Sequence, residues 1–162
     1  MSVTSIHKDA EALTKTITAD FDESVERVWQ VWADPRLLER WWGPPMYPAT
    51  FTDHDLSPGG RISYYMTSPE GEQYHGWWLV RSVHAPHGLE FQDGFADESG
   101  APNPEMPTNI TQVSLQARPD GGTTMTMLAT FASLAGMEQQ LEMGMEEGIT
   151  LAIGQIAGVL AG

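Results

Sequence analysis

The sequence predicts one α+β domain, in which a curved antiparallel sheet of about six or seven strands wraps around a long C-terminal helix. Alternating runs of large apolar residues, separated by Pro/Gly turns, fill the middle of the chain. Two short helical patterns follow the first alternating run, and a long amphipathic segment closes the chain. Such a helix buries its apolar stripe against one face of a sheet, and 162 residues suffice for one core.

The composition narrows the classes of function. The chain has no cysteine, which excludes disulfides and thiolate chemistry. Its formal net charge of −14 disfavours binding to nucleic acid or to anionic lipid, because both need clustered Lys and Arg. No apolar run is long enough to cross a membrane, and the N-terminus lacks the apolar core of a signal peptide. We therefore expect a cytoplasmic protein that binds neither nucleic acid nor membranes.

The N-terminal part of the chain changes character near residue 13. Residues 1–12 are polar and without a period, which predicts a loose arm before a single domain over residues 13–162. Residues 13–21 alternate and are rich in Thr, as in a half-buried strand. One face of this strand carries Leu13, Lys15, Ile17, Ala19 and Phe21.

Two short helices are predicted next. Asp22 or Ser24 is placed to cap the first helix, whose apolar residues recur at helical spacing and are Val25, Val28, Trp29 and Trp32. The second helix begins at Pro35, since proline suits a first turn, and ends at Gly43-Pro44-Pro45.

Strands then follow from Ala49 to Phe95, bounded by Pro/Gly turns, and a further hairpin covers residues 110–131. An acidic, proline-rich loop at 97–107 separates them. One long helix is predicted from about Leu134 to Leu160, with the apolar stripe Leu141, Met145, Ile149, Ile153, Ile156 and Leu160. Interior glycines weaken a helix, so those at 144, 148, 154 and 158 indicate close backbone approach or room left beneath the helix.

Several short motifs together resemble one superfamily. They are Glu23-Ser24-Val25-Glu26-Arg27-Val28-Trp29, Trp32-Ala33-Asp34-Pro35, Trp41-Trp42-Gly43-Pro44, the turn from Asp55 to Arg61, Gly76, the segment 86–91 and Gly144-Met145-Glu146-Glu147-Gly148. On these motifs the chain, over about residues 13–160, resembles the SRPBCC (START-like) superfamily. Within it, the chain is similar to the branch related to the C-terminal domain of the activator of the heat-shock-protein-ninety ATPase. One departure is Ile149, where many members have Trp; the smaller residue enlarges the pocket or marks a subfamily.

The resemblance implies the helix-grip fold of the birch-pollen allergen and of START domains. It implies less about activity, because members include ligand carriers, polyketide cyclases and aromatases, and co-chaperone modules.

A curved sheet that grips a helix leaves a cavity wherever side chains do not meet, and we predict that this cavity binds a ligand. Aromatic and methionine side chains serve there as core and as pocket wall, and methionine adapts to irregular spaces. The predicted lining residues are Trp42, Phe51, Tyr64, Met66, Trp77, Trp78, Arg81, Phe91, Asp93, Phe95, Met125, Met127, Phe131, Leu141, Met145 and Ile149.

Arg81 and Asp93 are the charged members of this set. A three-residue loop at 86–88 places them opposite each other in a hairpin, on the apolar face that carries Phe91 and Phe95. Charged groups among apolar walls need mutual pairing. The pair is either an anchor for a ligand carboxylate, carbonyl or hydroxyl, or a structural ion pair at the rim of the sheet.

No metal site, cofactor or assigned catalytic residue is predicted. His54, His75, His84 and His87 lack the spacing of a ligand set, and no Ser-His-Asp order or phosphate-binding glycine loop is present. His75 and Asp53 are either pocket-facing or surface residues.

Three functions are compatible with these features, and we rank them as follows. The first is binding of a small hydrophobic or aromatic molecule, as a carrier or sensor. The second is a cyclase- or hydrolase-type enzyme acting on a hydrophobic carbonyl compound, in which Arg81, Asp93, His75 or Tyr64 polarises the carbonyl or moves a proton. The third is a chaperone-interaction module, which needs an exposed docking patch that the sequence does not reveal. A homodimer formed through an edge strand or exposed tryptophans is compatible with the pattern.

Overall fold

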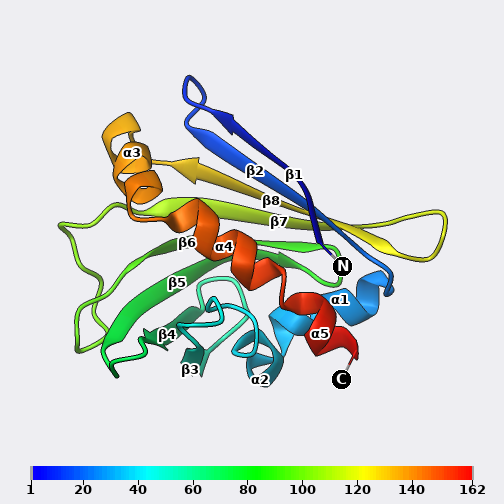
Figure 1. The fold of residues 1–162 in the computed structure, drawn as a ribbon, viewed down its shortest axis with the longest axis horizontal. Helices are drawn as coiled ribbons and strands as arrows, with labels where there is room; N and C mark the ends of the chain where they lie inside the picture. The colour runs from blue at the N-terminus through cyan, green and yellow to red at the C-terminus, as the bar shows by residue number, and fades with distance from the viewer. Residues whose placement is uncertain (1, 162) are drawn as a thin grey trace.

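Within residues 2–161, which the computed structural model describes, eight antiparallel strands form one sheet in the order β1-β2-β8-β7-β6-β5-β4-β3. Figure 1 shows that the sheet is curved and that the C-terminal helices cross one face of it. The predicted α+β helix-grip class is therefore confirmed, with more strands than expected. The strands are β1 (Ser2–Asp9), β2 (Thr14–Phe21), β3 (Ala49–His54), β4 (Arg61–Thr67), β5 (Gln73–His84), β6 (Gly88–Phe95), β7 (Asn109–Ala117) and β8 (Thr123–Phe131).

The additional strand is β1, which lies in the segment predicted as a loose arm over residues 1–12. That prediction is wrong for Ser2–Asp9, and Met1 lies outside the described residues. β1 pairs antiparallel with β2, with Ile6 opposite Ile17. Most side chains of β1 are exposed, so backbone hydrogen bonds to β2, rather than an apolar face, hold it in place. Pairing of this kind leaves no hydrophobic period in the sequence.

Two short helices follow β2 as predicted, and they are α1 (Val25–Ala33) and α2 (Pro35–Leu38). Ser24, one of the two predicted caps, accepts a hydrogen bond at the start of α1. α2 ends earlier than expected, so Trp41 and Trp42 lie in the connection to β3. Figure 1 shows both helices at one end of the sheet, beside the end of the chain.

The single long C-terminal helix predicted from the sequence is wrong, because the segment forms three helices that cross the sheet in turn (Figure 1). They are α3 (Leu134–Glu142), α4 (Met145–Ile153) and α5 (Ile156–Ala161). Gly144 adopts a left-handed φ of 84°, which separates α3 from α4, and Gly154 ends α4. None of the helices in residues 2–161 combines the length and the apolar character needed to span a bilayer.

The hydrophobic core fills the space between the sheet and the helices α1 and α5. Trp78 of β5 stacks on Phe91 of β6 with ring centroids 4.1 Å apart. Trp32 of α1 meets Trp41 edge to face at 4.8 Å, and Ile156 of α5 is fully buried. Aromatic pairs of this geometry add to the stabilisation by burial. This half of the concave face is therefore densely packed.

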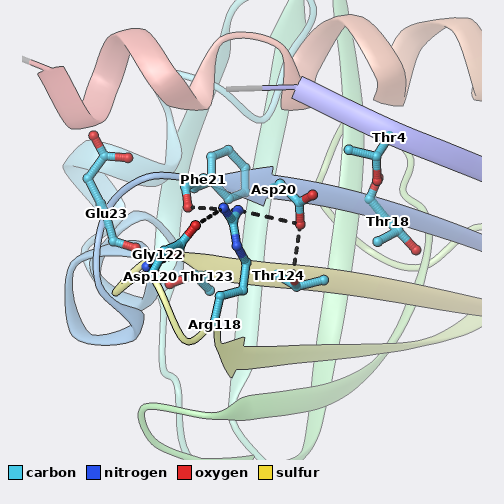
Figure 2. Close-up of polar contacts among 10 residues, drawn as sticks. All are labelled: Thr4, Thr18, Asp20, Phe21, Glu23, Arg118, Asp120, Gly122, Thr123 and Thr124. Atoms are coloured by element: carbon cyan, nitrogen blue, oxygen red, sulfur yellow. Dashed lines mark hydrogen bonds and ion pairs between the residues drawn. The ribbon is translucent and has the colours of Figure 1, made fainter.

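A polar cluster joins the end of β2 to the β7–β8 hairpin (Figure 2). Arg118 donates a hydrogen bond to the carbonyl oxygen of Phe21 at 3.5 Å, lies 3.8 Å from Asp20 and pairs with Asp120 in the turn. Thr124 donates to Asp20 at 2.8 Å. These contacts lie at one end of the antiparallel pairing between β2 and β8. Both strands also contribute to the wall of a cavity.

Candidate functional site

A cavity of about 290 Å³ lies between the sheet and the helices α3 and α4. Its volume is close to the lower end of the range of small-molecule pockets, about 300–1,000 Å³. Strands β2, β4, β6, β7 and β8 form one wall, and α3, α4 and the connection after α2 form the other. The lining is mostly apolar, and its apolar side chains are those of Ile17, Trp42, Pro44, Tyr64, Met66, Phe95, Met127, Ala129, Met143, Met145 and Ile149.

Glycines of the C-terminal segment contribute to this space. Gly144 breaks the helix at the cavity wall, and Gly148 lines the cavity from inside α4. A Cβ at Gly148 would meet no atom of a neighbouring element within 4 Å. An interior glycine costs a helix about 1 kcal/mol relative to Ala. Of the two explanations that the sequence offered, room beneath the helix applies to Gly148.

Tyr64 of β4 forms the aromatic end of the cavity. Its ring lies 5.1 Å from that of Phe51 and 6.1 Å from that of Trp42. Gly76 on β5 makes this position available, because a Cβ there would lie 2.4 Å from the Tyr64 ring. Burial raises the pKa of Tyr64 to about 12. The phenol therefore stays protonated at neutral pH.

Asp93 of β6 belongs to a compact polar cluster on the cavity wall. Its two carboxyl oxygens accept hydrogen bonds from Thr111 Oγ1 at 2.8 Å and from Asn109 Nδ2 at 3.3 Å. Asn109 exchanges two further hydrogen bonds, of 2.7 and 2.9 Å, with Gln140 of α3. Burial raises the pKa of Asp93 to about 6, while the Thr111 and Asn109 hydrogen bonds and the charge of Lys15 lower it. Its carboxyl group therefore titrates close to neutral pH.

Lys15 of β2 is the second ionisable group of the cavity. Its side chain lines the cavity and the residue is only 2% exposed. Among the described residues Nζ has no hydrogen-bond partner. Burial lowers the pKa of this amine, and the nearby carboxylate of Glu146 acts in the opposite direction. A buried amine without a partner is costly, and such groups gather at functional sites.

The structure brings part of the predicted lining set together. The predicted residues that line the cavity are Trp42, Tyr64, Met66, Asp93, Phe95, Met127, Met145 and Ile149. Their binding of a ligand stays a prediction. The others lie elsewhere: Phe51, Trp78, Phe91 and Met125 pack in the core, Trp77 packs against Gly94, Phe131 is buried away from the cavity, and Leu141 and Arg81 also lie outside its lining.

The predicted pairing of Arg81 with Asp93 is wrong. The turn pairs His84 with Gly88 and Val83 with Leu89, which shifts the register by two residues from the predicted one. An irregularity between Val80 and Ser82 shifts it by one more, so that Trp78 is opposite Asp93. Arg81 lies at this irregularity, and its half-exposed side chain forms an ion pair with Glu90 at 3.1 Å. A bulge of one residue reverses the faces of the strand beyond it, and it leaves no clear signal in the sequence. Of Arg81 and Asp93, only Asp93 lines the cavity.

Sequence reasoning missed the other polar residues that line the cavity with Asp93, namely Lys15, Asn109, Thr111 and Gln140. A signal existed for Lys15, because the alternation of β2 places it on the same face as Ile17, Ala19 and Phe21, all of which are buried. A lysine on the buried face of a strand therefore indicates a candidate functional site.

The histidines lie outside the cavity lining. His54 Nε2 is 3.2 Å from the carbonyl oxygen of Trp32, and His87 lies in the β5–β6 turn. Neither His75 nor Asp53, each of which had a pocket-facing alternative, lines the cavity. In residues 2–161 no three His, Asp or Glu side chains gather closely enough to hold a metal ion.

Comparisons with known proteins identify a matching family model and similar solved structures. Residues 22–161 match the family model described as activator of Hsp90 ATPase homolog 1-like protein. A solution NMR structure of an Arthrobacter aurescens protein is 50% identical, with a TM-score of 0.94, and the match covers 99% of this chain and 92% of that one. A crystal structure of a Mycobacterium smegmatis protein is 47% identical, with a TM-score of 0.90, over 98% of this chain and 96% of that one. No curated protein matches the sequence significantly.

Proposed function

This chain belongs to the family of activator of Hsp90 ATPase homolog 1-like proteins, and we propose that it binds a small hydrophobic or aromatic molecule in the cavity between the sheet and α4. The observation that carries the proposal is the make-up of the cavity, which combines apolar walls with one compact polar cluster. Ligand pockets typically have this composition. Family membership supports the fold and does not by itself transfer an activity.

The walls are suited to a ligand that varies in shape. Met66, Met127 and Met145 line the cavity, and methionine repacks around irregular ligands at little cost. The space beside Gly148 is not filled by any neighbouring element. A carrier or sensor of apolar molecules needs both properties, since it must admit its ligand without unfolding.

A neutral apolar probe tests the proposal. N-phenyl-1-naphthylamine is titrated into the purified protein, and its fluorescence rises when it enters an apolar site. Gly148→Leu fills the cavity from α4, and we expect it to weaken probe binding at least about tenfold, equivalent to about 1.4 kcal/mol. Gly158→Leu is the matched control, because Gly158 is an exposed helical glycine that does not line the cavity and has equally open surroundings.

Equal probe affinity in the wild type and in Gly148→Leu would contradict the proposal, as would absence of binding by the wild type. Native mass spectrometry of protein purified from its source provides a second test. A retained apolar molecule that is absent from the Gly148→Leu protein would identify the natural ligand.

Catalysis on an apolar carbonyl compound in the same cavity is the second candidate. Asp93 favours it, because a carboxyl group with a pKa of about 6 exchanges protons efficiently near neutral pH. Turnover of a bound carbonyl compound that is lost in Asp93→Asn, with probe binding retained, would support catalysis over binding alone.

A further inference from the structure

We propose that the cavity takes an apolar aldehyde and that Lys15 holds it covalently, as an imine. This inference rests on the proposed function and adds the chemical class of the ligand. It concerns a single nitrogen atom, Lys15 Nζ, which faces an apolar cavity from β2.

The environment of Lys15 differs sharply from that of the only other lysine in the chain, Lys8. The Lys8 side chain is 46% exposed, and its Nζ pairs with Glu146 at 3.0 Å. Lys15 is 2% exposed, and its Nζ has no hydrogen-bond partner among the described residues. The polar groups nearby are already engaged, since Asp93 is bonded to Thr111 and Asn109. The Lys15 amine is therefore available to a ligand.

An amine attacks a carbonyl carbon only in its unprotonated form. Lysines that perform this chemistry are desolvated in apolar pockets, which disfavours the ammonium ion. Burial is the largest influence on the pKa of Lys15, and it acts in this direction. The apolar walls of the cavity would at the same time hold the hydrocarbon part of the aldehyde.

The charges around Lys15 favour a neutral ligand over a carboxylate. Asp93 approaches from β6, Glu146 and Glu147 from α4, and Lys8 from β1. A ligand carboxylate would add a further negative charge to a site that already holds three acidic groups for two amines, and the chain as a whole carries −14. An aldehyde oxygen carries no such penalty, and it can accept a hydrogen bond.

The reaction balances without an oxidant or a reductant. The Lys15 nitrogen lone pair forms a bond to the aldehyde carbon, the C=O π pair moves to oxygen, and a proton passes from nitrogen to that oxygen to give a carbinolamine. The hydroxyl group then leaves as water with a proton that Asp93 supplies in its protonated form, and the nitrogen lone pair completes the C=N bond of a protonated iminium ion. Return of the nitrogen-bound proton to the Asp93 carboxylate gives the neutral imine and restores the acid. Hydrolysis by one water molecule reverses the process.

Reductive trapping tests the inference. The full chain is incubated at pH 7 with cinnamaldehyde and sodium cyanoborohydride, which reduces an imine irreversibly to a secondary amine. Peptide mass spectrometry then locates the adduct, and the presence of only two lysines makes the assignment direct. We expect Lys15 to be labelled at least about tenfold more than Lys8, because burial disfavours the protonated form of the Lys15 amine and the cavity holds the aldehyde beside it.

Matched variants separate the possible outcomes. Lys15→Met and Lys15→Arg should lose the adduct, whereas Lys8→Met, which changes a residue outside the cavity lining, should keep both the adduct and N-phenyl-1-naphthylamine binding. If the wild type binds the probe and forms no Lys15 adduct, this inference is overturned and the proposed function stands. If the wild type neither binds the probe nor forms the adduct, the inference and the proposed function are both overturned. Labelling confined to Lys8 or the N-terminal amine also refutes the assignment, and so does an adduct that persists in Lys15→Met.

Discussion

Replacing Asp93 by Asn should change the pH dependence of stability by an amount that follows from the structure. The pKa of this carboxyl is raised to about 6 in the folded protein, mainly by burial, from an ordinary value of 3.8. A difference of about 2.2 units corresponds to about 3 kcal/mol of folded-state destabilisation once the carboxylate is fully ionised. This figure is an upper bound, because Asp93 is only half-buried at the cavity wall and water reaches the cavity.

The sign of the effect is determined by which state holds the proton. Between pH 4 and pH 6 the folded protein retains a proton that the unfolded chain has released. The destabilisation is therefore nearly absent below about pH 4, grows as the pH rises and is complete above about pH 6. Asparagine carries no charge at any pH, so the variant lacks this term. Relative to the wild type, Asp93→Asn should gain about 1.4 kcal/mol, or less where water screens the charge, between pH 5 and pH 8.

Urea unfolding of both proteins at pH 5 and pH 8, followed by the fluorescence of the buried tryptophans, measures this difference. Asp97→Asn is the control with the opposite sign, because hydrogen bonds from Ser99 and the backbone of Ala101 lower the pKa of Asp97. Stability due to Asp97 is present above its ordinary pKa and is lost only as the pH falls through its lowered folded-state pKa, so Asp97→Asn should lose stability by nearly the same amount at pH 5 and at pH 8. An unchanged or inverted difference for Asp93→Asn would refute the assigned burial of this charge.

Four further predictions concern the walls of the cavity, and urea unfolding measures each. Gly148→Ala should raise the free energy of unfolding by about 0.5–1 kcal/mol, because α4 gains a helix-favouring residue with room for its Cβ. Gly144→Ala should lower it by at least about 1 kcal/mol, because its left-handed backbone disfavours a side chain, and equal effects of the two changes would contradict the helix break. Gln140→Leu should cost about 1–3 kcal/mol by leaving a buried amide unpaired, with no loss expected if the pair is solvated. Gly76→Ala should cost about 1–3 kcal/mol because its Cβ meets the Tyr64 ring, and a neutral result would show that the ring moves freely.

The fold was largely predictable because its signals are local. Alternation, Pro/Gly turns and caps such as Ser24 identified most strands and both short helices. The two failures come from backbone features without a side-chain period. β1 is held by pairing with β2 while its side chains face solvent, and Gly144 breaks a helix whose apolar stripe continues across the break. A stripe predicts which face is buried, and it does not show that the helix is continuous.

The cavity was predictable in kind and only partly in membership. Most of the predicted aromatic and methionine residues lie in the core cluster or line the cavity, but core and cavity wall have the same composition, so Phe91 and Met145 were indistinguishable in the sequence. The register of the β5–β6 hairpin determines which charged residues face each other, and the turn together with one bulge separates Arg81 from Asp93. Asn109 and Gln140 meet across a separation of 31 residues, which no local pattern records.

Local costs to stability are concentrated on the cavity wall. Gly148 leaves helix-stabilising contacts unmade, Gly144 interrupts the helix, Asp93 holds a carboxyl group where ionisation is unfavourable, and Lys15 buries an amine without a partner. The other half of the concave face, around Trp78, is packed with large apolar side chains. Proteins depart from such local rules mainly at functional sites. An apolar side chain at position 15 and an alanine at 148 would give a more stable domain, so their absence is itself an argument that the cavity binds a ligand.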